Sequence, residues 1–364
     1  MNRSGPKVLV LYGDMNGCTW WRAVRPAEAL NKAGSYVALA HKDEPGVENV
    51  AHLYDAVVLP RMSWEDHRTG ERFVSALHRA GLTVIYECDD DLFSPAVNSR
   101  INLLDREASL EKLEERRLDR LEALKLCDGI TVSSPRLATV MRTLVDYPVH
   151  VVPNALDVDW FQSKLEPRTI PEVTIGWTGG TRPDTDLLAM AEAWGIIAKR
   201  HPNVTFIVYG WIPQFLEKRG VPLDRVVAIP WREVDTYPGP FSNIDIGCAA
   251  VSNEPFNRSK TPIKAWEYAA GGAAVVATET LYGSDIRDGL TGYIAETTQE
   301  WVYALDDLVL NAPRRKRMAR ALMQRVQREH SLRENLWRWP AAWSSIIETF
   351  RASHRVGPQI LLAR

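Results

Sequence analysis

Short apolar runs alternate with amphipathic stretches along most of the chain. The runs are rich in Val and Ile and close on Gly, Pro, Asn or Asp, which predicts strands buried on both faces. The expected strands are residues 7–13, 56–60, 82–89, 129–134, 150–154, 173–180, 204–210, 225–230, 244–250 and 273–278. Intervening stretches predict helices at 23–33, 68–80, 184–200 and 262–271. This alternation implies parallel sheets with right-handed crossovers.

The number of strands indicates two domains. About ten strands exceed what one compact doubly wound sheet usually holds, and 364 residues suit two cores. A polar stretch with two prolines at 160–172 separates the two strand series, so we expect Rossmann-like domains at 1–165 and 166–330. A charged surface helix is expected at 101–126. Its apolar stripe would be Leu103, Leu110, Leu113, Leu118, Leu121 and Leu124.

Composition excludes several classes of protein. The chain is 45% hydrophobic and 25% charged with a net charge of −2, so it has no global bias toward nucleic acid or anionic lipid. Its four cysteines are far apart and form no C-x-x-C pair, which favours a reducing compartment. The N-terminal apolar run is too short for a signal peptide or a membrane span, so we expect a soluble cytoplasmic protein. The basic helix at 313–328 reads more readily as a solvated face than as a surface for DNA or lipid.

Open α/β sheets bind ligands where their strands end, so the residues after each strand are candidates. Gly17 follows the first strand in a loop that leads through Trp20, Trp21 and Arg22 into a helix. The spacing is not G-x-G-x-x-G, so the dinucleotide fingerprint is absent. An ordinary strand–helix loop and a polar-ligand site remain open for this segment.

A second glycine turn follows the strand at 173–180. Gly179 and Gly180 allow backbone amides to approach an anion, and Arg182 supplies a guanidinium for a phosphate. A tight turn beside a solvated arginine is the alternative.

Asp89, Asp90 and Asp91 follow another strand. Clustered carboxylates repel one another unless a cation or hydrogen-bond donors lie near. The cluster therefore indicates either a functional site or a fully solvent-exposed loop. Asp89 and Asp91 form a D-x-D, which holds a divalent metal in one class of sugar transferases. A helix N-cap is the other interpretation.

Lys260, Lys264 and Glu267 are spaced by four and three residues, which predicts one stripe on a helix. The stripe follows a strand and a polar loop, so we expect it at the ligand edge of the second sheet. There, ammonium groups can neutralise a diphosphate and a carboxylate can accept from a ribose hydroxyl. An internal ion-pair network is the alternative.

Several segments in order resemble the GT-B glycosyltransferases, in particular glycosyltransferase family four and a bacterial and phage-associated branch of it. The segments are "GCTWWRAVRPAEAL", "YECDDDLF", "DGITVSS" with "VVPNALDVDWF", "SNEPFNRSKTPIKAWEYAAGGAAVVAT" and "IRDGLTGYIAETTQEW". The resemblance implies two Rossmann-like domains whose parallel sheets face across a cleft. It also implies C-terminal helices at 331–364 that cross back to the first domain.

The resemblance implies a retaining, metal-independent hexosyltransferase with no cofactor, which uses a UDP- or GDP-linked sugar as co-substrate. Donor binding would fall to the second domain, with Glu267 on the ribose. The residues expected to contact the rest of the donor are Gly17, Gly179, Gly180, Arg182, Trp231, Asn257, Lys260 and Lys264. Lys264 and one of Asp89, Asp90 and Asp91, with Asp90 the first choice, would take part in catalysis. Trp20, Trp21 and Arg22 would face the acceptor.

This chain departs from the family at two positions. Ser259 stands where many members have a glutamate, whose role near the sugar would pass to Asn257 or to the loop of Glu254. Asp186 stands where many have a lysine, so the cationic role would move to Lys260, Lys264 and Arg182. Four classes of acceptor remain candidates: a glycan, a lipid-linked glycan, a protein and a modified DNA base. A sugar-nucleotide epimerase or hydrolase of the same fold and a non-catalytic nucleotide-sugar-binding protein are the alternative functions.

Overall fold

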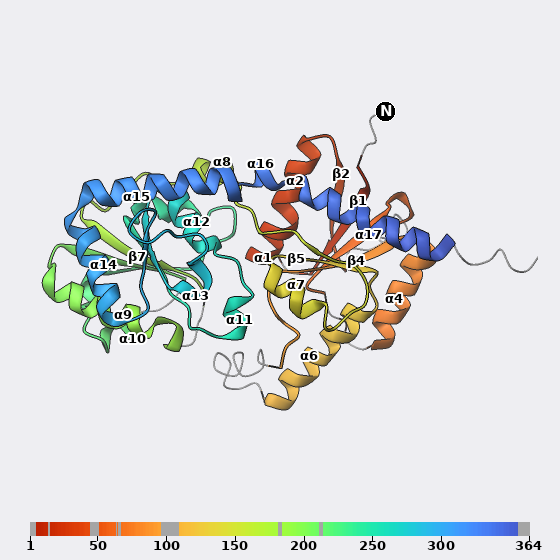
Figure 1. Cartoon of the computed structure of the whole chain (residues 1–364), viewed down its shortest axis with the longest axis horizontal. Coiled ribbons are helices and arrows are strands. Elements are labelled where there is room, and N and C mark those ends of the chain that lie inside the picture. Colours follow the sequence, from red (N-terminus) through yellow and green to blue (C-terminus); the bar gives the residue numbers. More distant parts are fainter. Residues whose placement is uncertain are drawn as a thin grey trace, which may run out of the picture. The chain divides into compact units, whose positions relative to one another are not determined.

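The computed structural model describes residues 5–13, 15–43, 51–62, 64, 67–95, 109–180, 184–210 and 214–355 (Figure 1). These residues form two compact units. Unit 1 comprises residues 1–154, 259–261 and 335–364, and unit 2 comprises residues 155–258 and 262–334. The domain limits expected from the sequence stay predictions.

Unit 1 is built on a six-stranded sheet in the order β2-β1-β3-β4-β5-β6, in which every pair is parallel. The strands are β1 (Lys7–Tyr12), β2 (Tyr36–His41), β3 (Ala56–Pro60), β4 (Thr83–Cys88), β5 (Gly129–Val132) and β6 (Val149–Val151). The helices are α1 (Gly17–Thr19), α2 (Arg25–Lys32), α4 (His67–Arg79), α6 (Leu110–Lys125), α7 (Pro135–Met141) and α17 (Arg338–Arg355). Strands β3 and β4 are buried along their whole length; β3 is entirely apolar, and the one charged residue of β4, Glu87, is paired with Arg22.

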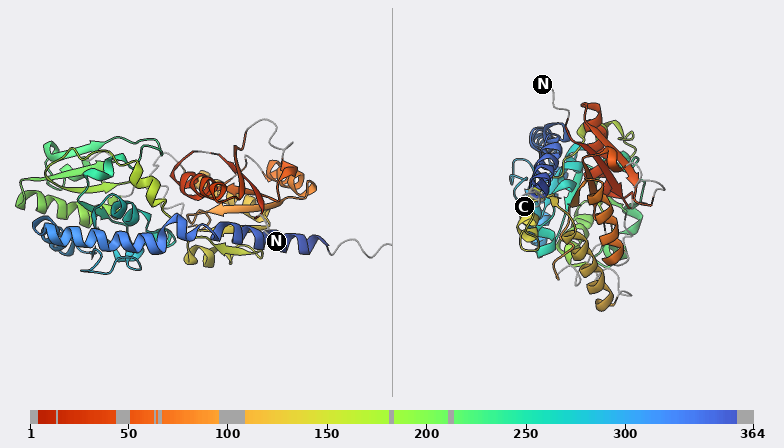
Figure 2. Two further views of the ribbon diagram at one scale, coloured as in Figure 1. Left: turned by 90° about the horizontal axis from the view of Figure 1, so that it is seen from above. Right: turned by 90° about the vertical axis from the view of Figure 1, so that its right-hand side faces the viewer.

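The C-terminal helix α17 belongs to unit 1 (Figure 2). The side chain of Ile346 fills the space beside Gly129, where an added Cβ would lie 2.5 Å from it. His78 stacks on Phe350 with ring centroids 5.4 Å apart. These contacts explain why the stretch from 338 to 355 carries large apolar residues although it follows the second sheet in the sequence.

Unit 2 holds a second parallel sheet of six strands, ordered β12-β11-β10-β7-β8-β9. The strands are β7 (Val173–Thr178), β8 (Val204–Tyr209), β9 (Val226–Ile229), β10 (Ile246–Ala249), β11 (Ala274–Ala277) and β12 (Tyr293–Ile294). Its helices are α8 (Val158–Ser163), α9 (Asp184–Arg200), α10 (Gln214–Glu217), α11 (Pro255–Arg258), α12 (Ile263–Ala270), α13 (Glu279–Tyr282), α14 (Thr298–Leu310), α15 (Ala312–Arg325) and α16 (Leu332–Asn335), whose last residue belongs to unit 1. A core that includes Trp177, Trp194 and Trp301 fills the space between this sheet and its helices.

All ten predicted strands are present, and two further strands in the described residues were not predicted. Strand β2 is partly exposed over most of its length and lacks consecutive Val or Ile, so its sequence "YVALAH" does not stand out as a buried run. Strand β12 has only two residues and lies at the edge of its sheet. Both missed strands are edge strands, where burial constrains the sequence least.

One local prediction in unit 1 was wrong, whereas the surface helix expected at 101–126 is present as α6 from Leu110 onward. The segment of Trp20 and Trp21 is a π-helical turn, Trp20–Val24, not a loop. It continues directly from helix α1, which Asn16 caps by accepting from Thr19 N at 3.1 Å. The leucine stripe of α6 is only partly buried: Leu113 and Leu124 are buried, whereas Leu110 is 58% and Leu118 45% exposed. Leu103 lies outside the described residues.

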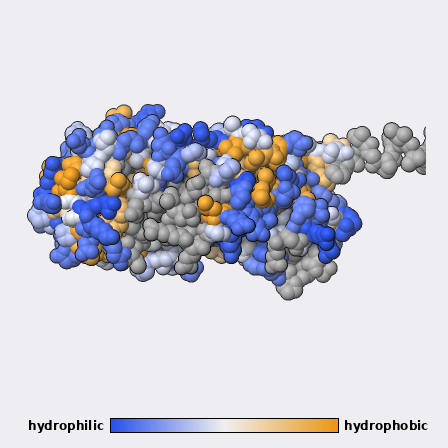
Figure 3. Space-filling model, turned by 90° about the horizontal axis from the view of Figure 1, so that it is seen from below, coloured by the Kyte–Doolittle hydropathy of each residue, from blue (hydrophilic) through white to orange (hydrophobic). Residues whose placement is uncertain are grey.

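The basic stretch from 313 to 328 is mainly α15. Arg315 is buried and donates to the carbonyl of Leu308, and Arg325 donates to the carbonyls of Ser284 and Asp285. Part of its charge therefore holds unit 2 together. No helix in the described part of the chain is long and apolar enough to cross a bilayer, and the face drawn in Figure 3 is mainly hydrophilic.

Candidate functional site

The strand order of unit 2 reverses between β7 and β10. Crossover helices leave the two sides of such a switch point toward opposite faces of the sheet, so a ligand crevice forms beyond the strand ends there. The chain after β7 is the glycine turn Gly179–Gly180, and the chain after β10 leads through α11 to α12. Of the predicted donor residues, these two segments contribute Gly179, Gly180, Asn257, Lys264 and Glu267, whereas Gly17 lies in unit 1 and Trp231 follows β9.

Gly179 and Lys264 lie side by side. Gly179 has a φ of +155°, and its backbone N–H donates to the carbonyl of Tyr209 at 3.0 Å. A Cβ added at this position would lie 3.1 Å from Lys264 Nζ and 3.1 Å from the ring of Trp177. A side chain here would thus crowd the ammonium group, whereas glycine leaves room beside it. Because Gly179 is buried and its N–H already donates to Tyr209, its amide does not face an anion as the sequence predicted.

Glu267 is one helical turn further along α12 and is only 3% exposed. Its Oε2 accepts a hydrogen bond from the hydroxyl of Tyr237 at 3.0 Å. Burial raises the pKa of Glu267 to about 7, although Lys264 and the Tyr237 hydroxyl act to lower it. The site thus holds a carboxylate that titrates near neutral pH beside a cation.

The prediction of one helical stripe through Lys260, Lys264 and Glu267 was wrong. Helix α12 begins only at Ile263, after Pro262, because proline disfavours helical backbone in the residue before it. Lys260 lies in the segment 259–261, which groups with unit 1, and its Nζ pairs with Asp90 Oδ1 at 3.0 Å. Lys264 and Glu267 remain together on α12.

Asn257 and Asp186 form a buried network instead of an open sugar contact. Asp186 Oδ1 accepts from Ser252 N at 2.9 Å and from the amide of Asn257 at 3.2 Å. Asn257 is fully buried, and its amide also donates to the carbonyl of Ser252 at 2.9 Å. The aspartate that replaces the expected lysine therefore anchors the loop after β10 to helix α9, which positions the approach to α12.

The remaining predicted donor residues differ in their surroundings. Trp231 is 62% exposed, and its ring lies 3.0 Å from where a Cβ of Gly210 would be. Gly180 has open space around its Cβ position, as does Gly17 in unit 1. Arg182 lies outside the described residues. An exposed indole ring remains suited to stacking on a base.

The three aspartates after β4 have different surroundings. Asp91 is 3% exposed, and its carboxylate accepts from Phe93 N at 3.3 Å, from Ser94 N at 3.0 Å and from the hydroxyl of Ser94 at 2.6 Å. Asp91 therefore closes a turn. Asp89 and Asp90 turn toward cations, and Arg61 Nη1 lies 3.5 Å from Asp89 and 3.7 Å from Asp90.

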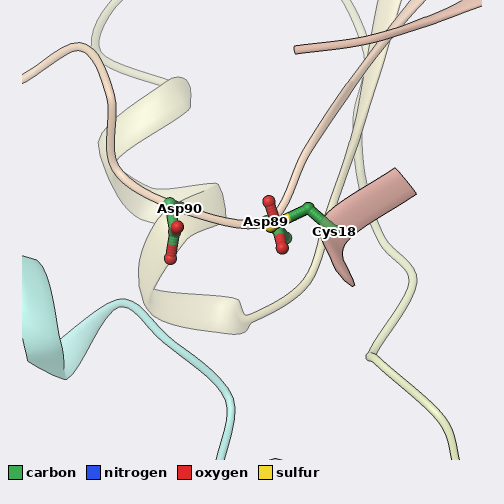
Figure 4. Close-up of side chains that lie close together, drawn as sticks. All are labelled: Cys18, Asp89 and Asp90. Atoms are coloured by element: carbon green, nitrogen blue, oxygen red, sulfur yellow. The ribbon is translucent and has the colours of Figure 1, made fainter. Parts of the chain in front are cut away.

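Cys18, on α1, reaches the same place as Asp89 and Asp90, which lie on the loop after β4 (Figure 4). One ligand atom from each of the three lies within 4.8 Å of the others, a spacing that a metal ion would accept. Arg61 and Lys260 already supply positive charge there, however, and burial raises the pKa of the Cys18 thiol well above its ordinary value. These features favour a charge-balanced cluster over a metal centre.

Arg22 has a role inside unit 1, which corrects its predicted exposure to an acceptor. It is 4% exposed, and its guanidinium bonds Glu87 at 2.8 Å, the carbonyl of Val152 at 2.6 Å and Asn154 at 3.0 Å. Trp21 is also buried, whereas Trp20 is partly exposed. The buried arginine ties the π-turn to β4 and to the chain after β6.

Sequence reasoning missed Arg61 and Tyr237. Arg61 directly follows β3, so the rule that ligands lie at strand ends was sufficient to select it. Tyr237 lies outside the regular helices and strands and is far from Glu267 in the sequence, so no local pattern pointed to their hydrogen bond.

The fold is that of the GT-B glycosyltransferases, with two six-stranded parallel sheets flanked by helices. Residues 172–311, which contain the switch point of unit 2, match the family described as Glycosyl transferases group 1. The Bacillus subtilis (strain 168) protein TuaH, which carries a provisional name as a glycosyltransferase of teichuronic acid biosynthesis, is 28% identical over 215 residues. That match covers 54% of this chain, and the chain spans about half (50%) of the length of this curated relative.

Solved structures support the same fold. Anabaena HepE, in complex with UDP and glucose, has a TM-score of 0.63 at 15% identity, over 93% of this chain and 100% of that one. Sucrose-phosphate synthase from Thermosynechococcus elongatus has a TM-score of 0.64 at 13% identity, over 94% of this chain and 100% of that one. At these identities the likeness establishes the fold alone.

Proposed function

We propose that the protein is a glycosyltransferase, which moves a hexose from a UDP- or GDP-linked sugar to an acceptor hydroxyl. The observation that carries this proposal is the grouping of Gly179, Lys264 and Glu267 at the switch point of unit 2. This grouping lies inside the segment that matches Glycosyl transferases group 1. Structures with a similar fold hold UDP or UDP-glucose, which agrees with a nucleotide-sugar donor.

The chemistry of a departing nucleoside diphosphate matches the donor residues. Negative charge grows on the diphosphate as the glycosidic bond breaks, and Lys264 Nζ beside the Gly179 backbone is placed to stabilise it. Glu267 can accept a hydrogen bond from a ribose hydroxyl when it is ionised. In the proposed reaction the ammonium group of Lys264 takes the role that a divalent cation has in other sugar transferases, so the reaction is metal-independent. Retention of anomeric configuration is part of the proposal.

The acceptor side of the proposal rests on Asp90. Lys260 Nζ lies 3.0 Å and Arg61 Nη1 3.7 Å from its carboxylate in unit 1. An ionised carboxylate at the end of a strand can orient an acceptor hydroxyl or take up its proton. Asp91 is less suited to this role because its oxygens already close a turn.

Calorimetric titration of the full chain with UDP and with GDP tests the donor site. Lys264→Gln should weaken the binding of the preferred nucleotide about tenfold or more, since a hydrogen bond to a charged group contributes about 1.5–3 kcal/mol. Lys199→Gln is the matched control, because Lys199 is exposed on α9 in the same unit. Equal affinities of both variants and the parent would overturn the donor assignment.

Donor turnover separates the alternative functions. A transferase should consume the nucleotide-sugar much faster when a cell extract that contains the acceptor is added than in its absence. An epimerase or hydrolase of the same fold should turn over the donor at the same rate with and without the extract. A binding protein should not turn it over.

A further inference from the structure

Unit 1 has a cavity of its own at the carboxyl edge of its sheet. Its volume is about 350 Å³, and its walls include Gly13, Lys42, Arg61, Leu92 and Arg120. Gly13 follows β1 and Arg61 follows β3, and the strand order of this sheet reverses between these two strands. The cavity therefore occupies the switch point of unit 1, where open α/β sheets bind ligands.

The charged side chains that line this cavity are all cationic within the described part of the chain. They are Lys42, Arg61 and Arg120. Lys42 packs its side chain along Gly13, where an added Cβ would lie 3.7 Å from its Cε. Asp43, its 3.5 Å ion-pair partner, is an exposed residue that does not line the cavity. The lining also includes the apolar residues Pro60, Met62 and Leu92.

Arg61 is held in its place by the backbone. Its φ of +50° is the one positive φ of a non-glycine residue in the described ranges, and its N–H continues the β-ladder by donating to the carbonyl of Glu87 at 2.8 Å. Such a conformation is costly and persists where surrounding structure enforces it, often at ligand sites. The guanidinium contacts Cys18, Asp89 and Asp90 through Nη1. Its Nε and Nη2 make no hydrogen bond to any described residue, so two donor nitrogens remain for a ligand.

Arg120 is the cation of this cavity that lacks a counter-charge. No described residue forms a hydrogen bond or an ion pair with its guanidinium. Burial lowers the pKa of Arg120 from its ordinary value, and the neighbouring Arg61 also lowers it. Asp89 and Asp90, by contrast, are already paired by Arg61 and Lys260. A bound anion would supply the charge that Arg120 lacks.

We propose that this cavity binds an anionic group, a carboxylate or a phosphate, carried by the acceptor sugar. Two guanidinium groups and an ammonium group line the cavity. A guanidinium group can donate two parallel hydrogen bonds to a carboxylate or a phosphate. Pro60, Met62 and Leu92 pack against the carbon skeleton of the sugar. The assignment to an acceptor rests on the proposed transferase function, and it places the acceptor beside Asp90, which Arg61 also contacts.

Ligand-observed NMR titrations of the full chain with three small probes test the proposal. Glucuronate and glucose 6-phosphate carry the two candidate anions, and glucose carries neither. At least one charged probe should bind about tenfold or more tightly than glucose, and the better of the two identifies the anion. Equal weak binding of all three would overturn the proposal.

Two matched variants on α6 decide whether the cavity is responsible. Arg120→Gln should weaken the binding of the preferred charged probe about tenfold, whereas Arg116→Gln, one turn earlier and exposed, should leave it unchanged. The same loss in both variants would mean a general charge effect and would refute the site. UDP and GDP affinities are measured alongside. A loss of nucleotide affinity in Arg120→Gln alone would assign the cavity to the donor instead, and failure of the parent to bind either nucleotide would refute the proposed function separately.

Discussion

Replacing Glu267 by Gln should make the protein more stable, and the gain should depend on pH. The carboxyl group is 3% exposed, and burial raises its pKa to about 7 from an ordinary value of 4.5. Gln keeps the size of the side chain and an oxygen that accepts from Tyr237 Oη, at the place where Glu267 Oε2 now accepts at 3.0 Å. The substitution therefore removes the buried charge with little change in packing.

The magnitude follows from the difference between the two pKa values. Between pH 4.5 and about 7 the folded protein holds a proton that the unfolded chain has released, so the free energy of unfolding falls as pH rises. One pKa unit corresponds to about 1.4 kcal/mol, so the cost of ionising Glu267 reaches about 3 kcal/mol above pH 7 and vanishes well below pH 4.5. The advantage of Glu267→Gln should thus be about 2–3 kcal/mol larger at pH 8 than at pH 5.

Urea unfolding of the parent and the variant at both pH values measures this difference. Glu217→Gln, an exposed position in the same unit, controls for the loss of one surface charge. A gain that is equal at pH 5 and pH 8 would show that Glu267 is not held in a strained ionised state. Loss of nucleotide affinity in the more stable variant would indicate that the ionised carboxylate is retained for the ligand, at a cost in stability.

The other predictions concern the aspartates after β4. Asp91→Asn should destabilise the fold by about 1–3 kcal/mol in urea unfolding, because its carboxylate closes a turn with three hydrogen bonds; unchanged stability would exclude that role. Asp90→Asn should leave nucleotide affinity intact in calorimetry but slow sugar transfer by about 100-fold; transfer at the parent rate would place acceptor activation elsewhere. Donor turnover should survive EDTA, since Arg61 and Lys260 balance the cluster; loss on chelation with rescue by manganese would return Asp89 to a metal role.

The sheets could be predicted from the sequence because parallel strands buried on both faces leave little choice of residue. The run "TVIYEC" at Thr83–Cys88 is fully buried and was found by its mainly apolar sequence. The spacing of Lys264 and Glu267 likewise identified α12, since both lie on that helix. Edge strand β2 was not predicted because an exposed strand does not need apolar residues at every position.

The site was predicted less well because spacing along the chain does not show where a helix begins. Lys260 has the spacing of a helical partner for Lys264, but α12 begins at Ile263, three residues after Lys260, and does not include it. The burial of Arg22 was also hidden, since its partners Glu87 and Asn154 are 65 and 132 residues away. Such long-range pairs leave no periodic signal in a single sequence.

The two switch points present their cations in different ways, which has a consequence for how each would hold its ligand. In unit 2, Lys264 extends from a helix toward a backbone turn that glycine keeps open, so the flexible ammonium group can follow a diphosphate as it leaves. In unit 1, Arg61 follows its strand directly in a left-handed conformation, and Asp89 and Asp90 fix one nitrogen of its rigid fork. A guanidinium group held in this way suits an anion that must keep one orientation through the reaction. The difference in side chain and backbone therefore agrees with a departing ligand at unit 2 and a stationary anionic acceptor at unit 1.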